Sequence, residues 1–191
     1  MIAAIGGELL EDIRSATRAT HVIASEKSVS LRRTPKLMIG ICVTSNIVSL
    51  DWLTQSAKKK QALPGTDFLL LEDKEAEEKY DFSMRETLLQ GDRLRARGTT
   101  LLGGCAVFIC KGVAGKKAPP AAELQVIVSA AGGKWISAAS KLKNEVPERL
   151  LIITSEPAEP KQLSPKDIDK AIRRGARHVT TTWFFHCIIA Q

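Results

Sequence analysis

The sequence predicts an α/β fold in which two repeats each form a small parallel sheet flanked by helices. Short β-rich stretches alternate with helical stretches along most of the chain, and this alternation is typical of parallel sheets with helices on their faces. Two of the three Gly-Gly pairs, those at residues 6–7 and 132–133, are each followed 45 to 50 residues later by a tryptophan that opens a helix. This duplication predicts two equivalent domains. The residues that mark it, and that we expect to be structural, are Gly6, Gly7, Trp52, Gly132, Gly133 and Trp183.

In the first repeat, residues 1–7 are typical of the last turn of a helix that ends at a glycine cap. Residues 8–10 and 20–24 are strand candidates, and the second of them has the higher β propensity. Residues 46–49 form a further short strand that leads directly into a helix over 50–60. Three lysines end this helix, where cations interact favourably with the helix dipole.

A helix predicted over residues 34–43 has a clear start signal. Thr34 is a good N-cap, because its hydroxyl can accept a hydrogen bond from a first-turn N–H, and Pro35 follows where its missing N–H costs nothing. Lys36 lies in the first turn, next to free N–H groups and the positive end of the dipole, and two arginines precede Thr34. The residues alone leave two interpretations open, an anion-binding site and a solvated basic turn before a core helix.

The stretch over residues 73–100 is rich in charge and poor in strand formers, and a helix is expected over about 83–90. We interpret it as a linker between a first repeat, residues 1–72, and a second repeat, residues 101–191. The second repeat is predicted to contain strands over 105–110, 134–136, 150–154 and 178–180, and helices over 121–131, 164–174 and 183–191.

Composition narrows the classes of function. The net charge of +7 favours an acidic partner, such as nucleic acid or a phosphorylated protein, without choosing between them. The four cysteines form no CxxC pair, so we expect buried free thiols rather than a zinc site. No apolar run is long enough to cross a membrane, and no secretory signal is evident. We expect no cofactor, no metal and no small-molecule substrate, because the sequence shows no Ser-His-Asp arrangement, metal-ligand cluster or P-loop.

The Gly-Gly pair followed by a helix-opening Trp resembles the BRCT domain, and the chain resembles a tandem BRCT pair. Two stretches, 33–36 (Arg-Thr-Pro-Lys) and 48–53 (Val-Ser-Leu-Asp-Trp-Leu), are similar to the pairs that read phosphopeptides. The resemblance implies two four-stranded repeats packed head to tail. It also implies a non-enzymatic scaffold of the DNA damage response, acting in the nucleus.

The resemblance implies roles for three residues. Lys36 matches the lysine that binds the phosphate, and Arg33 matches the arginine that holds the peptide backbone, or a free C-terminal carboxylate, three residues after the phosphoserine. Thr34 matches the capping threonine between them. The rest of the peptide would lie in a groove between the repeats. One wall would be a loop that carries Lys116 and Lys117, for which a plain solvated loop is the alternative.

The first repeat departs from the family pattern at its start. About thirty residues of the second repeat precede Gly132, whereas five residues precede Gly6. We therefore expect the first repeat, residues 1–72, to be incomplete at its N-terminus and to lack its first strand, together with a Ser or Thr and a Gly of the family's phosphate pocket. Loss of a central strand should expose sheet edges. Truncation of a longer protein and degeneration of the repeat are the two explanations, and the presence of Arg33 and Lys36 favours truncation.

The function expected from these features is the binding of a phosphoserine tail, with the phosphorylated C-terminus of a histone as the candidate ligand, to recruit repair and checkpoint factors to chromatin. The alternative is a BRCT module that binds DNA or another protein without phosphate specificity. The net charge and the lysine run over 58–60 favour DNA in that case.

Overall fold

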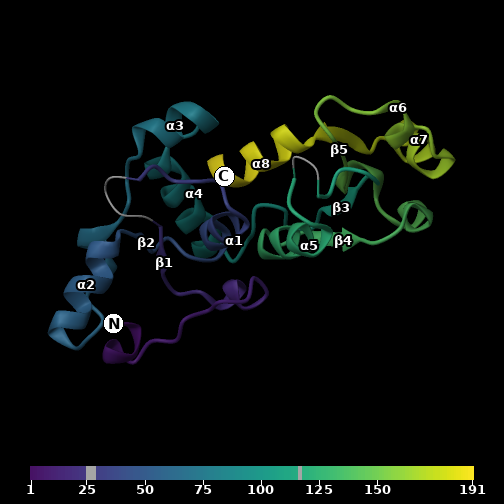
Figure 1. Ribbon diagram of the computed structural model, residues 1–191. Coiled ribbons are helices and arrows are strands. Elements are labelled where there is room, and N and C mark those ends of the chain that lie inside the picture. The colour runs from purple at the N-terminus through teal and green to yellow at the C-terminus, as the bar shows by residue number, and fades with distance from the viewer. Residues whose placement is uncertain (25–28, 116–117) are drawn as a thin grey trace. The chain divides into compact units, whose positions relative to one another are not determined.

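The computed structural model describes residues 1–24, 29–115 and 118–191 (Figure 1). The chain divides into two compact units, of which the first comprises Met1–Gly98 with Ile189–Gln191 and the second comprises Thr99–Ile188. Each unit contains a parallel sheet flanked by helices, so the predicted α/β fold and its duplication are confirmed. The finer division into repeat, linker and repeat, and the head-to-tail packing, stay predictions.

The first unit has a smaller sheet than we expected. Strand β1 (Val22–Ile23) pairs in parallel with β2 (Ile47–Val48), and these two form the whole sheet among the residues that the structure describes. The helices of this unit are α1 (Pro35–Val43), α2 (Leu50–Lys59), α3 (Lys74–Tyr80) and α4 (Met84–Ala96), with 3₁₀ turns at Ile2–Ile5, Ser15–Arg18 and Gly65–Phe68.

The strand predicted over residues 8–10 was wrong, because these residues are irregular in the structure. A strand needs a neighbour to complete its hydrogen bonds. The neighbour that the second unit provides at the equivalent place, its central strand, has no counterpart among the described residues of the first unit. The helix end predicted at residues 1–7 is a 3₁₀ turn capped by Gly6, whose φ is 69°.

Helix α1 packs closely on β1 because of a glycine. A Cβ atom added at Gly40 would collide with a methyl group of Val22, so only a glycine allows the helix and the strand to approach this closely. Around this contact, Leu37, Ile41 and Ile47 are buried in the core of the first unit. The core therefore fixes α1, and with it the helix start that carries the predicted site.

The second unit has the complete four-stranded sheet that the sequence predicts. Its strand order is β4-β3-β5-β6 and every neighbouring pair is parallel. The strands are β3 (Ala106–Ile109), β4 (Lys134–Ile136), β5 (Leu150–Thr154) and β6 (Arg177–Thr180), and the helices are α5 (Ala121–Ala130), α6 (Pro160–Leu163), α7 (Lys166–Arg173) and α8 (Thr181–Ala190).

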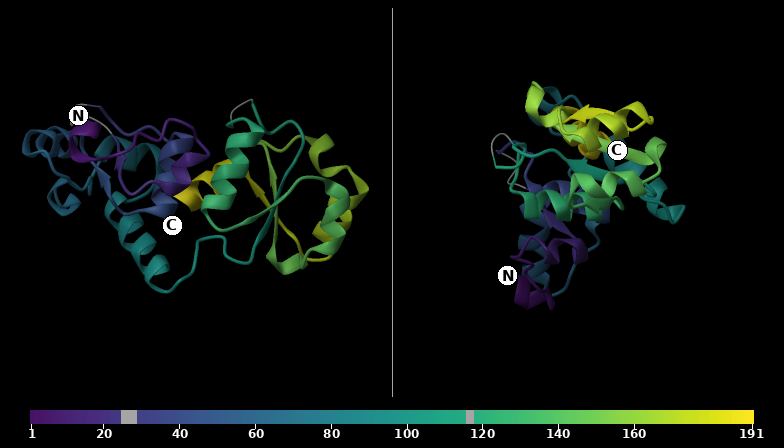
Figure 2. Two further views of the ribbon diagram at one scale, coloured as in Figure 1. Left: turned by 90° about the horizontal axis from the view of Figure 1, so that it is seen from below. Right: turned by 90° about the vertical axis from the view of Figure 1, so that its right-hand side faces the viewer.

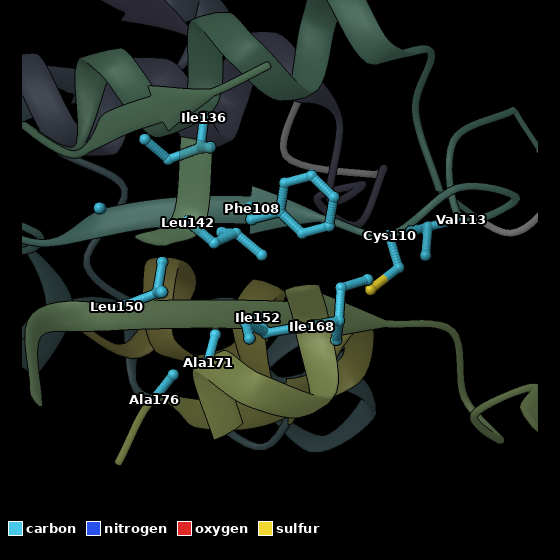
Figure 3. Close-up of a cluster of buried hydrophobic side chains, with 11 residues drawn as sticks. Phe108, Cys110, Val113, Ile136, Leu142, Leu150, Ile152, Ile168, Ala171 and Ala176 are labelled. Atoms are coloured by element: carbon cyan, nitrogen blue, oxygen red, sulfur yellow. The ribbon is translucent and has the colours of Figure 1, made fainter. Parts of the chain in front are cut away.

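Helices cover both faces of this sheet. In the left view of Figure 2, α5 lies on one side of the strands and α7 on the other. Figure 3 shows the core on the α7 side, where Phe108, Ile136 and Ile152 point toward Leu142 and Ile168. Alternate residues of a strand point to opposite faces, so a strand in a sheet that is covered on both faces is buried along its whole length, as β5 is.

All four cysteines are free, as predicted, but only Cys110 is fully buried. Burial raises the pKa of the Cys110 thiol to about 11. At pH 8 about one Cys110 in a thousand is then a thiolate, which is the reactive form.

We expect iodoacetamide to leave Cys110 unmodified in the folded protein at pH 8 while the half-buried Cys42 and Cys105 react, as peptide mass spectrometry can show. Equal labelling of Cys110 and Cys105 would contradict this expectation.

Candidate functional site

The start of α1 forms as the sequence predicts. Thr34 is the N-cap, and its Oγ1 accepts a hydrogen bond from the Leu37 N–H at 3.2 Å. The Met38 N–H bonds the Thr34 carbonyl at 3.0 Å, and Pro35 has no N–H to offer. The Lys36 N–H meets no acceptor among the described residues. Lys36 therefore offers a ligand one backbone donor, one ammonium group and the positive end of the helix dipole.

The segment before α1 is held by Asp73, the N-cap of α3. One carboxylate oxygen accepts the Leu31 N–H at 2.7 Å, and the other accepts the Ser30 hydroxyl at 3.1 Å and the Ala76 N–H at 3.0 Å. Leu31 itself is buried. The contacts of Asp73 with Ser30 and Leu31, made across more than 40 residues of sequence, fix the backbone just ahead of Arg32 and Arg33.

The predicted site residues do not all face the same way. Thr34 and Lys36 line a cavity of about 750 Å³ within the first unit, and Arg32 lines it too. Arg33 instead lies over the ring of Tyr80, the last residue of α3, at 5.0 Å from the ring centroid. Burial lowers the pKa of the Arg33 guanidinium, and the charge of Tyr80 opposes this shift. The structure thus brings Thr34 and Lys36 together and places Arg33 in different surroundings.

Two ring residues of the cavity wall form a stack that sequence reasoning missed. His21 stacks on Trp52 with 4.4 Å between ring centroids, and both line the cavity. Trp52 is buried and donates its indole N–H to the Leu63 carbonyl at 2.8 Å. Trp183, the equivalent residue of the second unit, is only half-buried, and Arg177 lies 5.5 Å over its ring.

The stack predicts a pH dependence of stability. Burial lowers the pKa of His21 below its ordinary value of 6.5, so folding favours the neutral ring. The stability that this preference contributes is complete above pH 6.5 and is lost as the pH falls through the lowered pKa. We expect the first unit to melt at a lower temperature at pH 5 than at pH 7.5. We expect His21→Phe, which keeps the stack, to reduce that difference in a circular dichroism melt. An unchanged difference in the variant would contradict the assignment.

The structure describes the second Gly-Gly pair but not the two lysines that we expected beside the groove. Gly132 and Gly133 end α5, where the Gly133 N–H reaches the Val128 carbonyl at 2.9 Å. Lys116 and Lys117, expected beside the groove between the repeats, lie outside the described residues, so their role stays a prediction.

Within the described ranges, no group of three His, Cys, Asp or Glu residues could hold a metal ion. The same residues include no helix with the length and apolarity that a membrane span requires.

Comparison with known proteins shows which sequences and structures this chain is similar to. No family model matches the chain. Over 151 residues, 79% of the chain, it is 31% identical to the human mediator of DNA damage checkpoint protein 1, and over 133 residues, 70% of the chain, it is 33% identical to bovine PAX-interacting protein 1. The chain spans only 6% and 12% of these relatives.

The crystal structure of the BRCT5-BRCT6 domains of S. pombe Brc1 superposes with a TM-score of 0.71 at 19% identity, and covers 99% of this chain and 84% of that one. The fold is therefore that of a tandem BRCT pair, as the repeated Gly-Gly and Trp motifs predict. Its sequence is similar to part of the human checkpoint mediator, and the BRCT pairs of such mediators are binding modules that catalyse no reaction.

Proposed function

We propose that this chain is a phosphopeptide-binding scaffold module of the DNA damage response and that it acts in the nucleus. The observation that carries the proposal is the pairing, at Lys36, of an exposed ammonium group with a backbone N–H that meets no acceptor among the described residues, both at the start of α1. A phosphate there accepts charge-assisted hydrogen bonds from both groups and gains from the helix dipole.

The choice of ligand follows from the neighbours of Lys36 and from the relatives. A phosphoserine tail fits a site where an exposed cation lies beside a helix start, and the similarity to a mediator of the DNA damage checkpoint supports a phosphorylated histone C-terminus as the candidate. Arg33, whose planar guanidinium suits a carboxylate, would hold the peptide backbone or its terminal carboxylate. Recruitment of repair and checkpoint factors would follow from this binding.

A DNA-binding module is the second candidate. Lys58, Lys59 and Lys60 are all exposed at the end of α2, and the net charge is +7. DNA binding by such a surface would weaken steeply as the salt concentration rises. It would also be indifferent to any phosphate on a peptide.

Three labelled ligands separate these functions in a fluorescence anisotropy titration. They are a phosphoserine peptide with a free C-terminus, its unphosphorylated twin and a short DNA duplex, each measured at two salt concentrations. We expect the phosphorylated peptide to bind at least about tenfold more tightly than its twin. Equal affinity for the two peptides, together with salt-sensitive binding of the duplex, would overturn the proposal in favour of DNA.

A further inference from the structure

The net charge of the chain lies almost entirely on one of its two units. The second unit, Thr99–Ile188, has 13 Lys and Arg residues against 7 Asp and Glu, which gives it +6 of the total charge of +7. The first unit has 15 Lys and Arg against 14 Asp and Glu and is close to neutral. A charge asymmetry of this kind within one chain is typical of proteins that bind a polyanion through one part.

Two segments of the second unit bring part of this charge together. The 3₁₀ helix η4 (Ala139–Asn144) packs against α7, and its buried Leu142 belongs to the core on the α7 side of the sheet (Figure 3). Lys141 and Lys143 flank Leu142 in the sequence, and both are exposed. Arg174, directly after α7, donates through Nη1 to the Lys143 carbonyl at 3.3 Å. The end of α7 therefore lies beside the lysines of η4.

The exposed side of α7 continues this basic surface. Lys170 and Arg174 are one turn apart, and both are exposed. Arg173 pairs with Asp169 at 3.0 Å, whereas Lys143, Lys170 and Arg174 make no ion pair within the described ranges. The negative end of the helix dipole accounts for cations on the last turn of α7, but not for the two lysines that η4 adds. We define the basic patch as Lys141, Lys143, Lys170 and Arg174.

The chemistry of the basic patch fits a phosphate backbone better than a protein surface. Protein interfaces are held by apolar or aromatic side chains at their centre. Of the large apolar side chains in the described part of the second unit, only Val146 is exposed, and a single exposed apolar residue is ordinary for a protein surface. Duplex nucleic acid, in contrast, offers a dense row of phosphates that lysine and arginine contact without an apolar anchor.

We propose that the second unit binds the phosphate backbone of a nucleic-acid duplex through the basic patch, without preference for a base sequence. The four side chains contact phosphates, and each contact releases counterions on binding. The basic patch and the start of α1 belong to different units, so this binding needs no phosphopeptide and does not rest on the proposed function. It also differs from DNA binding by the lysine run over 58–60, which belongs to the nearly neutral first unit.

A salt titration of duplex binding to the intact chain tests the proposal. The probes are labelled duplexes of about 20 base pairs, one of DNA and one of RNA, and the readout is fluorescence anisotropy. The variant combines Lys141→Gln, Lys143→Gln and Lys170→Gln. All three lysines are exposed, so the variant should keep the melting temperature of the natural sequence.

The expected result is a loss of both affinity and salt dependence. Without three phosphate contacts, the slope of log affinity against log salt concentration should fall by about 2 to 3. Binding at low salt should weaken at least about tenfold. The duplex that the natural sequence binds more tightly identifies the ligand as DNA or RNA.

The matched control replaces Lys58, Lys59 and Lys60 by glutamine, which removes the same charge from an exposed run of lysines. We expect this control to bind the duplex within about twofold of the natural sequence. Equal losses from the two triple variants would show that the net charge alone acts and would overturn the proposal. No saturable binding of either duplex, or tighter binding of a polyglutamate peptide, would overturn it too. None of these measurements uses the phosphopeptide, so failure of the proposed function would be seen separately.

Discussion

Lys36→Ala is expected to weaken binding of a phosphoserine peptide by about tenfold to a hundredfold. The variant removes one charge-assisted hydrogen bond at a helix start, and such a bond contributes about 1.5 to 3 kcal/mol. Thr34 and the α1 backbone are unchanged, so the helix should still form. Isothermal titration calorimetry on both proteins measures the loss directly.

The matched control for Lys36→Ala is Lys166→Ala. Lys166 also follows a proline at a helix start, in the second unit, and it is also exposed. The Lys166→Ala substitution removes the same charge from the molecule as Lys36→Ala does. Any general effect of net charge on the binding of an anionic peptide should therefore be equal in the two variants. We expect Lys166→Ala to bind within about twofold of the natural sequence. Equal losses from both substitutions would show that Lys36 acts only through the overall charge.

Gly132→Ala is expected to destabilise the second unit by about 2 to 5 kcal/mol. Gly132 has a φ of +81°, a conformation that costs other residues about 1 to 2 kcal/mol. An added Cβ would also collide with Oγ1 and Cβ of Thr100, and such overpacking costs about 1 to 3 kcal/mol. For a unit of this size, the melting temperature should fall by roughly 10 to 25 °C in a differential scanning calorimetry trace.

Gly115→Ala separates the two causes. Gly115 belongs to the same unit and has a φ of +80°, but among the described residues no atom outside its chain neighbours lies within 4 Å of the Cβ it would gain. It should therefore show the conformational cost alone, about 1 to 2 kcal/mol. If Gly115→Ala and Gly132→Ala lower the melting temperature equally, the close approach of Thr100 to Gly132 contributes nothing. If neither lowers it, the positive φ at Gly132 is not a requirement of the fold.

The parts of the fold that local chemistry decides could be predicted from the sequence. The apolar run of β5 at Leu150–Thr154 and the cap, proline and helix at Thr34–Val43 are both present as expected. The strand expected over residues 8–10 failed because pairing, rather than propensity, decides whether a strand forms. Helix α6 at Pro160–Leu163 was missed because four residues carry no periodic signal.

The candidate site was predictable only in part for the same reason. Lys36 is the second residue of α1, and the cap at Thr34 fixes that position. The position of Lys36 could therefore be predicted from its neighbours in the sequence. The direction of Arg33 depends on Tyr80, and the segment ahead of it depends on Asp73, both more than 40 positions further along the chain. No local pattern encodes contacts at that separation, and the stack of His21 on Trp52 escaped prediction in the same way.

The most direct test of phosphate recognition at the start of α1 is a double-mutant cycle between Lys36 and the peptide phosphate. It combines the natural sequence and Lys36→Ala with the phosphorylated and unphosphorylated peptides, and the four affinities give a coupling free energy. We predict a coupling of about 1.5 kcal/mol or more, in line with one charged hydrogen bond. A coupling of zero, with phosphate still favoured in Lys36→Ala, would place the phosphate elsewhere on the molecule.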